Sequence, residues 1–169
     1  METVSIPYQF IRERLVLTWT DVAWGFQNGW LQADAVVTYA VEKLAEGDEA
    51  DAAEVELAGL MPAELARVPA LLDEVVKSKG ADYSTAKANW LYLVLAWVFE
   101  NRNDSDDPLG LVEEIYADFN YPSEIRNFVR YMPPEDGYEA KAHAHKENLN
   151  RLFREWESYL DSFGGRGKS

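Results

Sequence analysis

The sequence predicts an all-α fold, a single-domain bundle of about seven to nine helices arranged as packed helical hairpins around a central apolar helix. Apolar residues recur at helical spacing along most of the chain, and hydrophobic residues make up 47% of its 169 residues, enough for one core. The longest apolar run, residues 90–99, is about half as long as the ~20 residues that a transmembrane helix needs. We therefore expect one domain over residues 1–163 and a flexible tail over residues 164–169.

Helix signals follow one another in order along the chain. Within each segment apolar residues share a face, and glycine, proline or a capping side chain separates it from the next segment. The second helix, for example, begins at a Thr20 or Asp21 cap and ends at Gly29. The helices are expected at residues 7–15, 20–28, 33–44, 48–60, 63–79 (divided near Pro69), 86–102, 108–119, 122–131 and 149–163.

Two of these segments differ from the others in the distribution of their apolar residues. Residues 48–60 are rich in Ala and Glu but have few large apolar side chains, so this helix should be marginal or exposed. Residues 86–102, after a Ser84 or Thr85 cap, are apolar on every side at their centre, which is typical of a buried helix. A buried strand is the alternative, because the run is rich in strand-forming residues, but its length favours the helix.

The composition disfavours several classes of function. Acidic residues outnumber Lys and Arg by 30 to 16, a net charge of −14, so the chain should repel nucleic acid and anionic membrane lipids. Cysteine is absent, which removes disulfides, thiolate metal sites and cysteine nucleophiles. The N-terminal residues lack the pattern of a signal peptide, so we expect a cytoplasmic protein.

The sequence contains no strong catalytic or metal-binding motif. His143 and His145 lie on different sides of a helix and cannot share a metal ion as an i, i+4 pair does. A calcium loop starting at Asn103 would have Glu114 at its last ligand position, but Pro108 stands where the turn needs glycine. We expect no enzyme activity, no cofactor and no metal. Carboxylate pairs in the acidic segments keep a metal-dependent hydrolase as an alternative.

The negative charge is concentrated in two regions. Residues 42–74 hold ten acidic residues against two basic ones, and residues 100–124 hold eight against one. Two anionic regions would steer a basic protein towards them and raise its association rate, although they could equally be ordinary solvated helix faces. The residues expected to contact a partner are, first, Asp104, Asp106, Asp107, Glu113, Glu114 and Asp118 and, second, Glu49, Asp51, Glu54 and Glu56.

Four stretches of the sequence resemble a known family. They read LTWTDVAWGFQNGWL (residues 17–31), LYLVLAWVFENR (91–102), DPLGLVEEIYADF (107–119) and FVRYMP (128–133). This pattern of core aromatics and helix boundaries resembles a small bacterial family, the domain of unknown function 2247, over residues 15–133. Members of that family are similar to proteins encoded beside polymorphic or contact-dependent toxins, and the resemblance implies an immunity role.

The leading hypothesis is therefore an immunity protein. It would neutralise a basic toxin domain, such as a nuclease, by covering the nucleic-acid surface of the toxin with acidic side chains. The alternative is a helical adaptor or regulatory protein that uses an exposed aromatic residue, such as Trp30 or Tyr121, as its anchor. The sequence predicts no particular oligomeric state.

Overall fold

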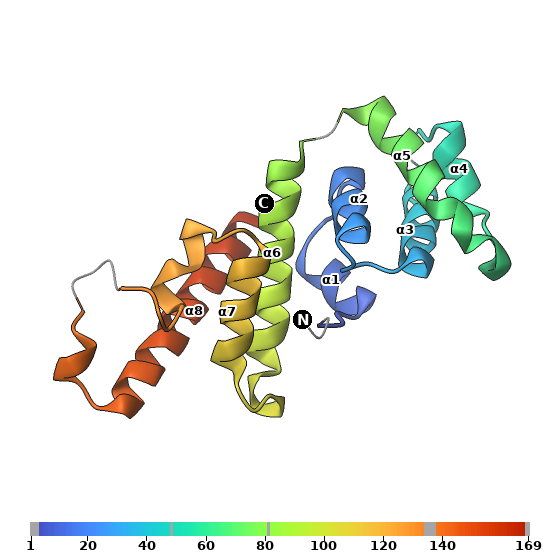
Figure 1. Cartoon of the computed structure of the whole chain (residues 1–169). Helices are drawn as coiled ribbons and strands as arrows, with labels where there is room; N and C mark the ends of the chain where they lie inside the picture. Colours follow the sequence, from blue (N-terminus) through green and yellow to red (C-terminus); the bar gives the residue numbers. More distant parts are fainter. Residues whose placement is uncertain (1–3, 48, 81, 134–137, 168–169) are drawn as a thin grey trace. The chain divides into compact units, whose positions relative to one another are not determined.

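The protein is all-α throughout the residues that the structure describes (Figure 1). The structure, a computed structural model, describes residues 4–47, 49–80, 82–133 and 138–167, with the backbone alone at residues 142 and 164–167. In order, the elements are α1 (Tyr8–Arg14), α2 (Trp19–Gln27), α3 (Ala33–Ala45), α4 (Ala52–Ala58), the 3-10 helix η1 (Pro62–Arg67), α5 (Val68–Lys79), α6 (Tyr83–Glu100), η2 (Arg102–Asp104), α7 (Pro108–Asp118), η3 (Ser123–Phe128), η4 (Ala140–Ala142) and α8 (His145–Gly167). The prediction of an all-α fold is confirmed.

The chain divides into two compact units, and the division falls within α6. The N-terminal unit comprises residues 2–90 and the C-terminal unit residues 91–169. Helix α6 is buried along its apolar run, where Trp90, Leu93 and Leu95 are fully inaccessible to solvent. The prediction of a buried helix, rather than a strand, is therefore confirmed. The arrangement of the whole chain as one domain around α6 stays a prediction.

Helix α4 is a packed element of the N-terminal unit. It contacts both α3 and α5, and Leu57 on its inner face is fully buried. Ala53, one turn earlier, is also buried, and its small side chain suits a close approach between helices. The expectation of an exposed helix at residues 48–60 is wrong for the face that carries Ala53 and Leu57, and its marginal stability stays a prediction.

The cap of helix α2 lies two or three residues earlier than the Thr20 or Asp21 that the sequence predicts. Its N-cap is Thr18, whose hydroxyl accepts a hydrogen bond from the Asp21 N–H at 3.2 Å, while the Asp21 carboxylate accepts from the Thr18 N–H at 2.9 Å. Asp21 is therefore the third helical residue of a capping box and not itself the cap. Asp21 also accepts hydrogen bonds from α6, through its side chain from Asn89 at 2.9 Å and through its main-chain oxygen from Trp90 at 2.7 Å.

Trp90 also packs directly against the backbone of α2. A Cβ atom added at Gly25 would lie 2.1 Å from the indole ring, far inside van der Waals contact. Only glycine leaves room for the ring at this position. The hydrogen bond from Trp90 to Asp21 and the absence of a side chain at Gly25 together fix the first half of α6 on α2 within the N-terminal unit.

The C-terminal unit is built around aromatic side chains. Helix α8 packs on η3, and the fully buried Trp156 stacks on Phe128 at 6.0 Å between ring centroids. The ring of Phe99, on α6, meets Trp156 edge-on at 5.1 Å. Helix α8 continues to Gly167, beyond the end expected at residue 163, and residues 168–169 of the expected tail lie outside the described residues. No helix in the described ranges has both the length and the apolar character needed to cross a bilayer.

Candidate functional site

The carboxylates at the start of α4 serve the fold. The Asp51 carboxylate accepts a hydrogen bond from the Glu54 N–H at 3.0 Å, and the Glu54 carboxylate accepts from the Asp51 N–H at 2.7 Å. Glu54 also forms an ion pair with Lys79 of α5 at 3.1 Å, and the residue is only 5% exposed. The expectation that Glu54 contacts a partner from the protein surface is therefore wrong, because its carboxylate is buried and pairs with Lys79 between α4 and α5.

Four other carboxylates in the described part of residues 42–74, those of Glu42, Glu46, Glu56 and Glu64, also have partners within the N-terminal unit. Glu42 accepts a hydrogen bond from the Tyr8 hydroxyl at 3.0 Å and pairs with Arg12. Glu56 lies 2.9 Å from Arg67, which it shares with the carboxylate of the neighbouring η1. In the described part of this region, the exposed carboxylates that have no hydrogen-bond or ion-pair partner are Glu49, Asp73 and Glu74.

Two carboxylates of residues 100–124 are joined by one arginine. Asp107 caps α7, since its side chain accepts a hydrogen bond from the Gly110 N–H at 3.1 Å. Arg130 reaches both oxygens of Asp107 through two nitrogens, each at 3.2 Å, and its Nε donates to Glu113. This bidentate geometry with a second carboxylate is typical of an ordered arginine. Of the residues expected to bind a partner, Asp107 and Glu113 are thus already neutralised in part.

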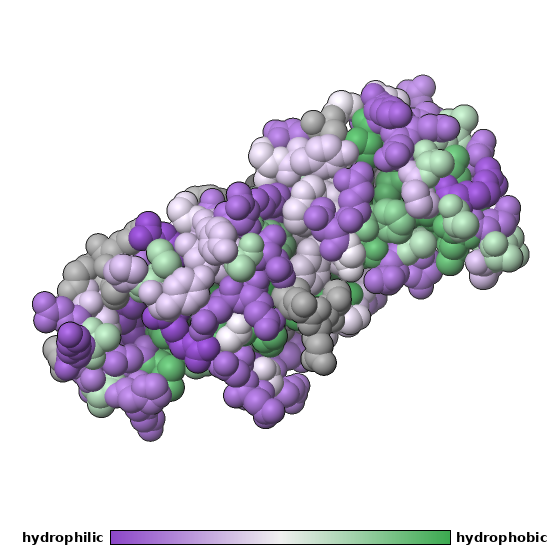
Figure 2. Space-filling view, viewed as in Figure 1, coloured by the Kyte–Doolittle hydropathy of each residue, from purple (hydrophilic) through white to green (hydrophobic). Residues whose placement is uncertain are grey.

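The other four carboxylates expected in this region are exposed. Asp104 ends η2, Asp106 follows in the loop, and Glu114 and Asp118 lie on α7; within the described residues none of the four has a hydrogen-bond or ion-pair partner. Glu114 and Asp118 are four residues apart and share a face of the helix. We call these four residues the α7 acidic surface. In Figure 2 hydrophilic side chains cover the end of α7 next to η2.

Tyrosines gather at the other end of α7. Tyr121 and Tyr131 are 60% and 57% exposed, and both rings contact the buried ring of Tyr116, at 5.2 and 6.1 Å between centroids. Asn120 and Tyr121 both have left-handed backbone conformations, with φ of 62° and 56°. We call Tyr116, Tyr121 and Tyr131 the tyrosine cluster. Tyr121 is exposed, as the sequence argument requires of an anchor, and that role stays a prediction.

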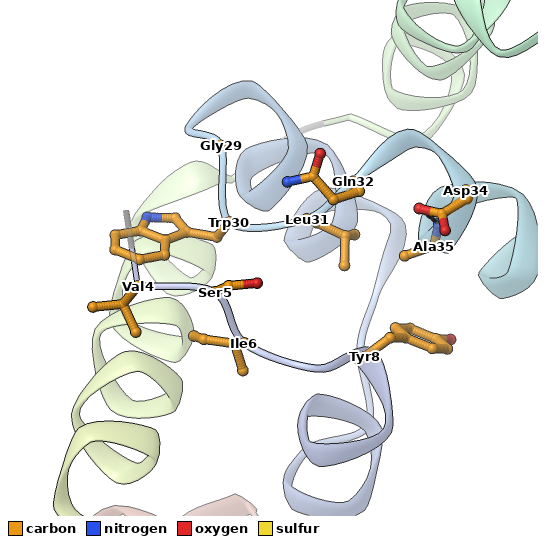
Figure 3. Close-up of a pocket in the computed structure, with 10 residues that line it drawn as sticks. All are labelled: Val4, Ser5, Ile6, Tyr8, Gly29, Trp30, Leu31, Gln32, Asp34 and Ala35. Carbon is orange, nitrogen blue, oxygen red and sulfur yellow. Dashed lines mark hydrogen bonds between the residues drawn. The ribbon is translucent and has the colours of Figure 1, made fainter. Parts of the chain in front are cut away.

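Trp30 differs from Tyr121. Its ring is 8% exposed and lies beside Val4 in a hollow of about 300 Å³ in the N-terminal unit (Figure 3). The expectation that Trp30 anchors a partner from the surface is therefore wrong, because the side chain is packed. The titratable side chains that line this hollow are Tyr8 and Asp34, which provide a phenol and one carboxylate.

Two further hollows of the N-terminal unit, of about 230 and 330 Å³, share the lining residues Val16, Leu17, Tyr39 and Lys43. Burial, and then the negative charges of neighbouring side chains beginning with Asp21, raise the pKa of Tyr39 above its ordinary value. Its hydroxyl donates to the Leu17 main-chain oxygen at 2.9 Å. This tyrosine is therefore held in its neutral form as a structural donor.

The two histidines have separate surroundings. His143 lies 3.0 Å from Glu147 and stacks on Tyr138 at 4.6 Å between ring centroids, whereas His145 begins α8. In the described ranges, no three His, Asp or Glu side chains gather as the ligands of a metal ion would.

Comparison with known proteins places the chain among bacterial sequences. A family model described as "Uncharacterized protein conserved in bacteria (DUF2247)" matches residues 8–164. The match includes the segment around α4 and most of α8, which lie outside the four stretches that carry the resemblance in the sequence. Comparison with curated proteins and with solved structures found no match.

Proposed function

Since the chain belongs to the bacterial family DUF2247, we propose that it binds a basic protein partner through the α7 acidic surface. We further propose that this partner is a toxin domain, which the protein neutralises. The observation that carries the proposal is the set of exposed, unpartnered carboxylates Asp104, Asp106, Glu114 and Asp118. Such a surface complements a basic protein and accelerates its encounter.

The arrangement of these carboxylates is unfavourable for the fold itself. Asp118 lies in the last turn of α7, where the helix dipole favours a positive charge, and Glu114 and Asp118 repel each other across one turn. Each effect costs a few tenths of a kcal/mol. A surface that lowers stability is more readily explained by a binding role than by solubility alone, because charges elsewhere would provide solubility without this cost.

The toxin is proposed from the resemblance of the sequence to proteins encoded beside toxins. A nuclease toxin presents a basic nucleic-acid surface, and the α7 acidic surface complements it in charge. Occupation of that surface by carboxylates would exclude the nucleic-acid substrate. The test is co-expression with each protein encoded beside the gene that stops bacterial growth when it is expressed alone, with growth as the readout. Lack of growth rescue by any such pairing would contradict neutralisation.

The role of the α7 acidic surface can be tested with two variants of the chain that lose the same charge at different places. The variant D106N/E114Q/D118N removes three unpartnered carboxylates from it, and the variant E49Q/D73N/E74Q removes three from the N-terminal unit. Both variants lose the same formal charge. We expect the first variant to slow association with the basic partner about tenfold at low salt and to flatten the salt dependence. The second variant should change the rate by less than about twofold.

The two variants separate local complementarity from net charge. Equal slowing of association by both variants would mean that total charge alone drives association. An unchanged association rate in the first variant would exclude the α7 acidic surface as the binding surface.

A helical adaptor remains the second candidate, because the exposed Tyr121 suits an interface anchor. A captured partner that is neither basic nor toxic would favour the adaptor.

A further inference from the structure

In the tyrosine cluster, the exposed rings of Tyr121 and Tyr131 each contact the buried ring of Tyr116. Tyr121 meets the buried Tyr116 nearly perpendicularly, at 83° between ring planes, and Tyr131 meets it at 56°. The two outer rings make no contact with each other. Each keeps more than half of its surface open to solvent. The cluster therefore presents two exposed aromatic rings that both rest on one buried ring.

The backbone fixes the position of Tyr121. A left-handed conformation is rare for a bulky residue and costs on the order of 1 kcal/mol or more, whereas asparagine tolerates it better. The Tyr121 N–H donates to the Tyr116 main-chain oxygen at 2.8 Å, and the edge contact between the two rings offsets part of the cost. Tyr121 is thus an ordered ring on a constrained turn, which lowers the entropy lost when a ligand packs on it.

The charge next to the cluster is negative. Glu113 lies close enough to contribute, after partial desolvation and the neighbouring tyrosines, to the raised pKa of Tyr131. The unpartnered Asp118 ends the helix that leads into Tyr121. The neighbouring Arg130 is engaged by two carboxylates, so its charge is more than balanced.

On the basis of the proposed function, we propose that Tyr121 and Tyr131 receive an arginine side chain of the basic partner. A guanidinium group stacks on tyrosine rings, is less strongly hydrated than an ammonium group and can pair with nearby carboxylates at the same time. An apolar side chain would instead desolvate the neighbouring carboxylates without compensation. The arginine would act as the anchor of the interface, and the α7 acidic surface would guide its approach.

The test uses the full chain and a fluorescently labelled Arg-Gly repeat peptide, with a Lys-Gly peptide as comparison, in binding titrations at several salt concentrations. The Y121L/Y131L variant should weaken binding of the arginine peptide about five- to thirtyfold, since each contact between a cation and an exposed ring is worth about 0.5–1 kcal/mol. The salt dependence should stay unchanged, because no charge is lost. The Y121F/Y131F variant keeps both rings and should bind like the wild type. Tyr131→Leu alone repeats the test if the double variant unfolds.

The outcomes separate this inference from the proposed function. If Y121L/Y131L binds like the wild type while D106N/E114Q/D118N binds more weakly, the arginine site is overturned and the acidic surface stands. If neither variant weakens binding, both proposals fail. Equal affinity for the lysine peptide would overturn the choice of arginine.

Discussion

The acidic region of residues 42–74 and that of residues 100–124 have similar net charges, yet their carboxylates have different surroundings. In the first region, caps and ion pairs with Arg12, Arg67 and Lys79 occupy most of the side chains. In the second, Arg130 engages two carboxylates, and the four of the α7 acidic surface stay exposed without partners. The charge of a sequence segment therefore does not identify a binding surface. The number of carboxylates left without an intramolecular partner is the better guide.

The largest expected effect concerns the stability of the first region. Glu54→Ala should lower the free energy of unfolding by about 1–3 kcal/mol, because it removes a capping side chain and leaves Lys79 without its partner. Glu114→Ala, in the second region, should change it by less than about 0.5 kcal/mol. Urea denaturation of both variants measures the difference. Equal losses would show that both regions serve the fold.

The second prediction concerns the stability of the protein at alkaline pH, which depends on Tyr39 and on the carboxylates of the first region near it. The pKa of Tyr39 is raised in the folded state above its ordinary value of 10.0, first by burial and then by negative neighbours that include Glu46 and Glu54. The unfolded chain therefore loses this proton first, so the contribution of Tyr39 to stability is fully present below its unfolded pKa of 10.0 and is lost as the pH rises above it. Tyr39→Phe should make the fall in unfolding free energy above this pH shallower. Identical pH profiles would contradict the prediction.

Replacing an arginine in each region should affect the association rate differently. Arg130→Gln frees Asp107 and Glu113, so association with a basic partner should become about two- to threefold faster and more dependent on salt. Arg67→Gln frees Glu56 and Glu64 in the first region and should leave that rate unchanged. Because these ion pairs are largely exposed, each variant should lose less than about 1 kcal/mol of stability. Stopped-flow association measures the rates, and equal acceleration by both would refute the distinction.

The smallest expected effect is a gain in stability. Asp118→Asn removes a negative charge from the C-terminal turn of α7 and from the neighbourhood of Glu114, so it should raise the free energy of unfolding by about 0.2–0.5 kcal/mol. Asp73→Asn, an exposed and unpartnered carboxylate within α5, is the matched control and should have a smaller effect. A loss of stability with Asp118→Asn would mean that this carboxylate has a structural role.

Local signals were sufficient to predict most helices. The apolar stripe that predicts a helix at residues 33–44 matches α3, which ends two residues before Gly47 with its positive φ. The capping box of α2 was also readable, since Thr18 and Asp21 have the required spacing, but the sequence argument placed the cap too late. Helix α4 could not be judged in this way, because its stability depends on contacts with α3 and α5.

The pairing of carboxylates was beyond sequence reasoning. Glu54 and Lys79 lie on different helices, and Arg130 reaches Asp107 from beyond η3. No periodicity within one helix reveals such partners. Tyr131 was missed for the same reason, because its neighbour Tyr116 is on α7.

The missing side chain at Gly25 has a practical consequence for genetics. Because any Cβ atom there would overlap the Trp90 ring, Gly25→Ala should force α2 and the first half of α6 apart within the N-terminal unit. This destabilised variant should be folded at low growth temperature and unfolded at a higher one, which would make the gene a temperature-sensitive allele. Shifting cells to the higher temperature would then remove the folded protein at a chosen moment, and the growth of the cells afterwards would test the proposed neutralisation of a toxin.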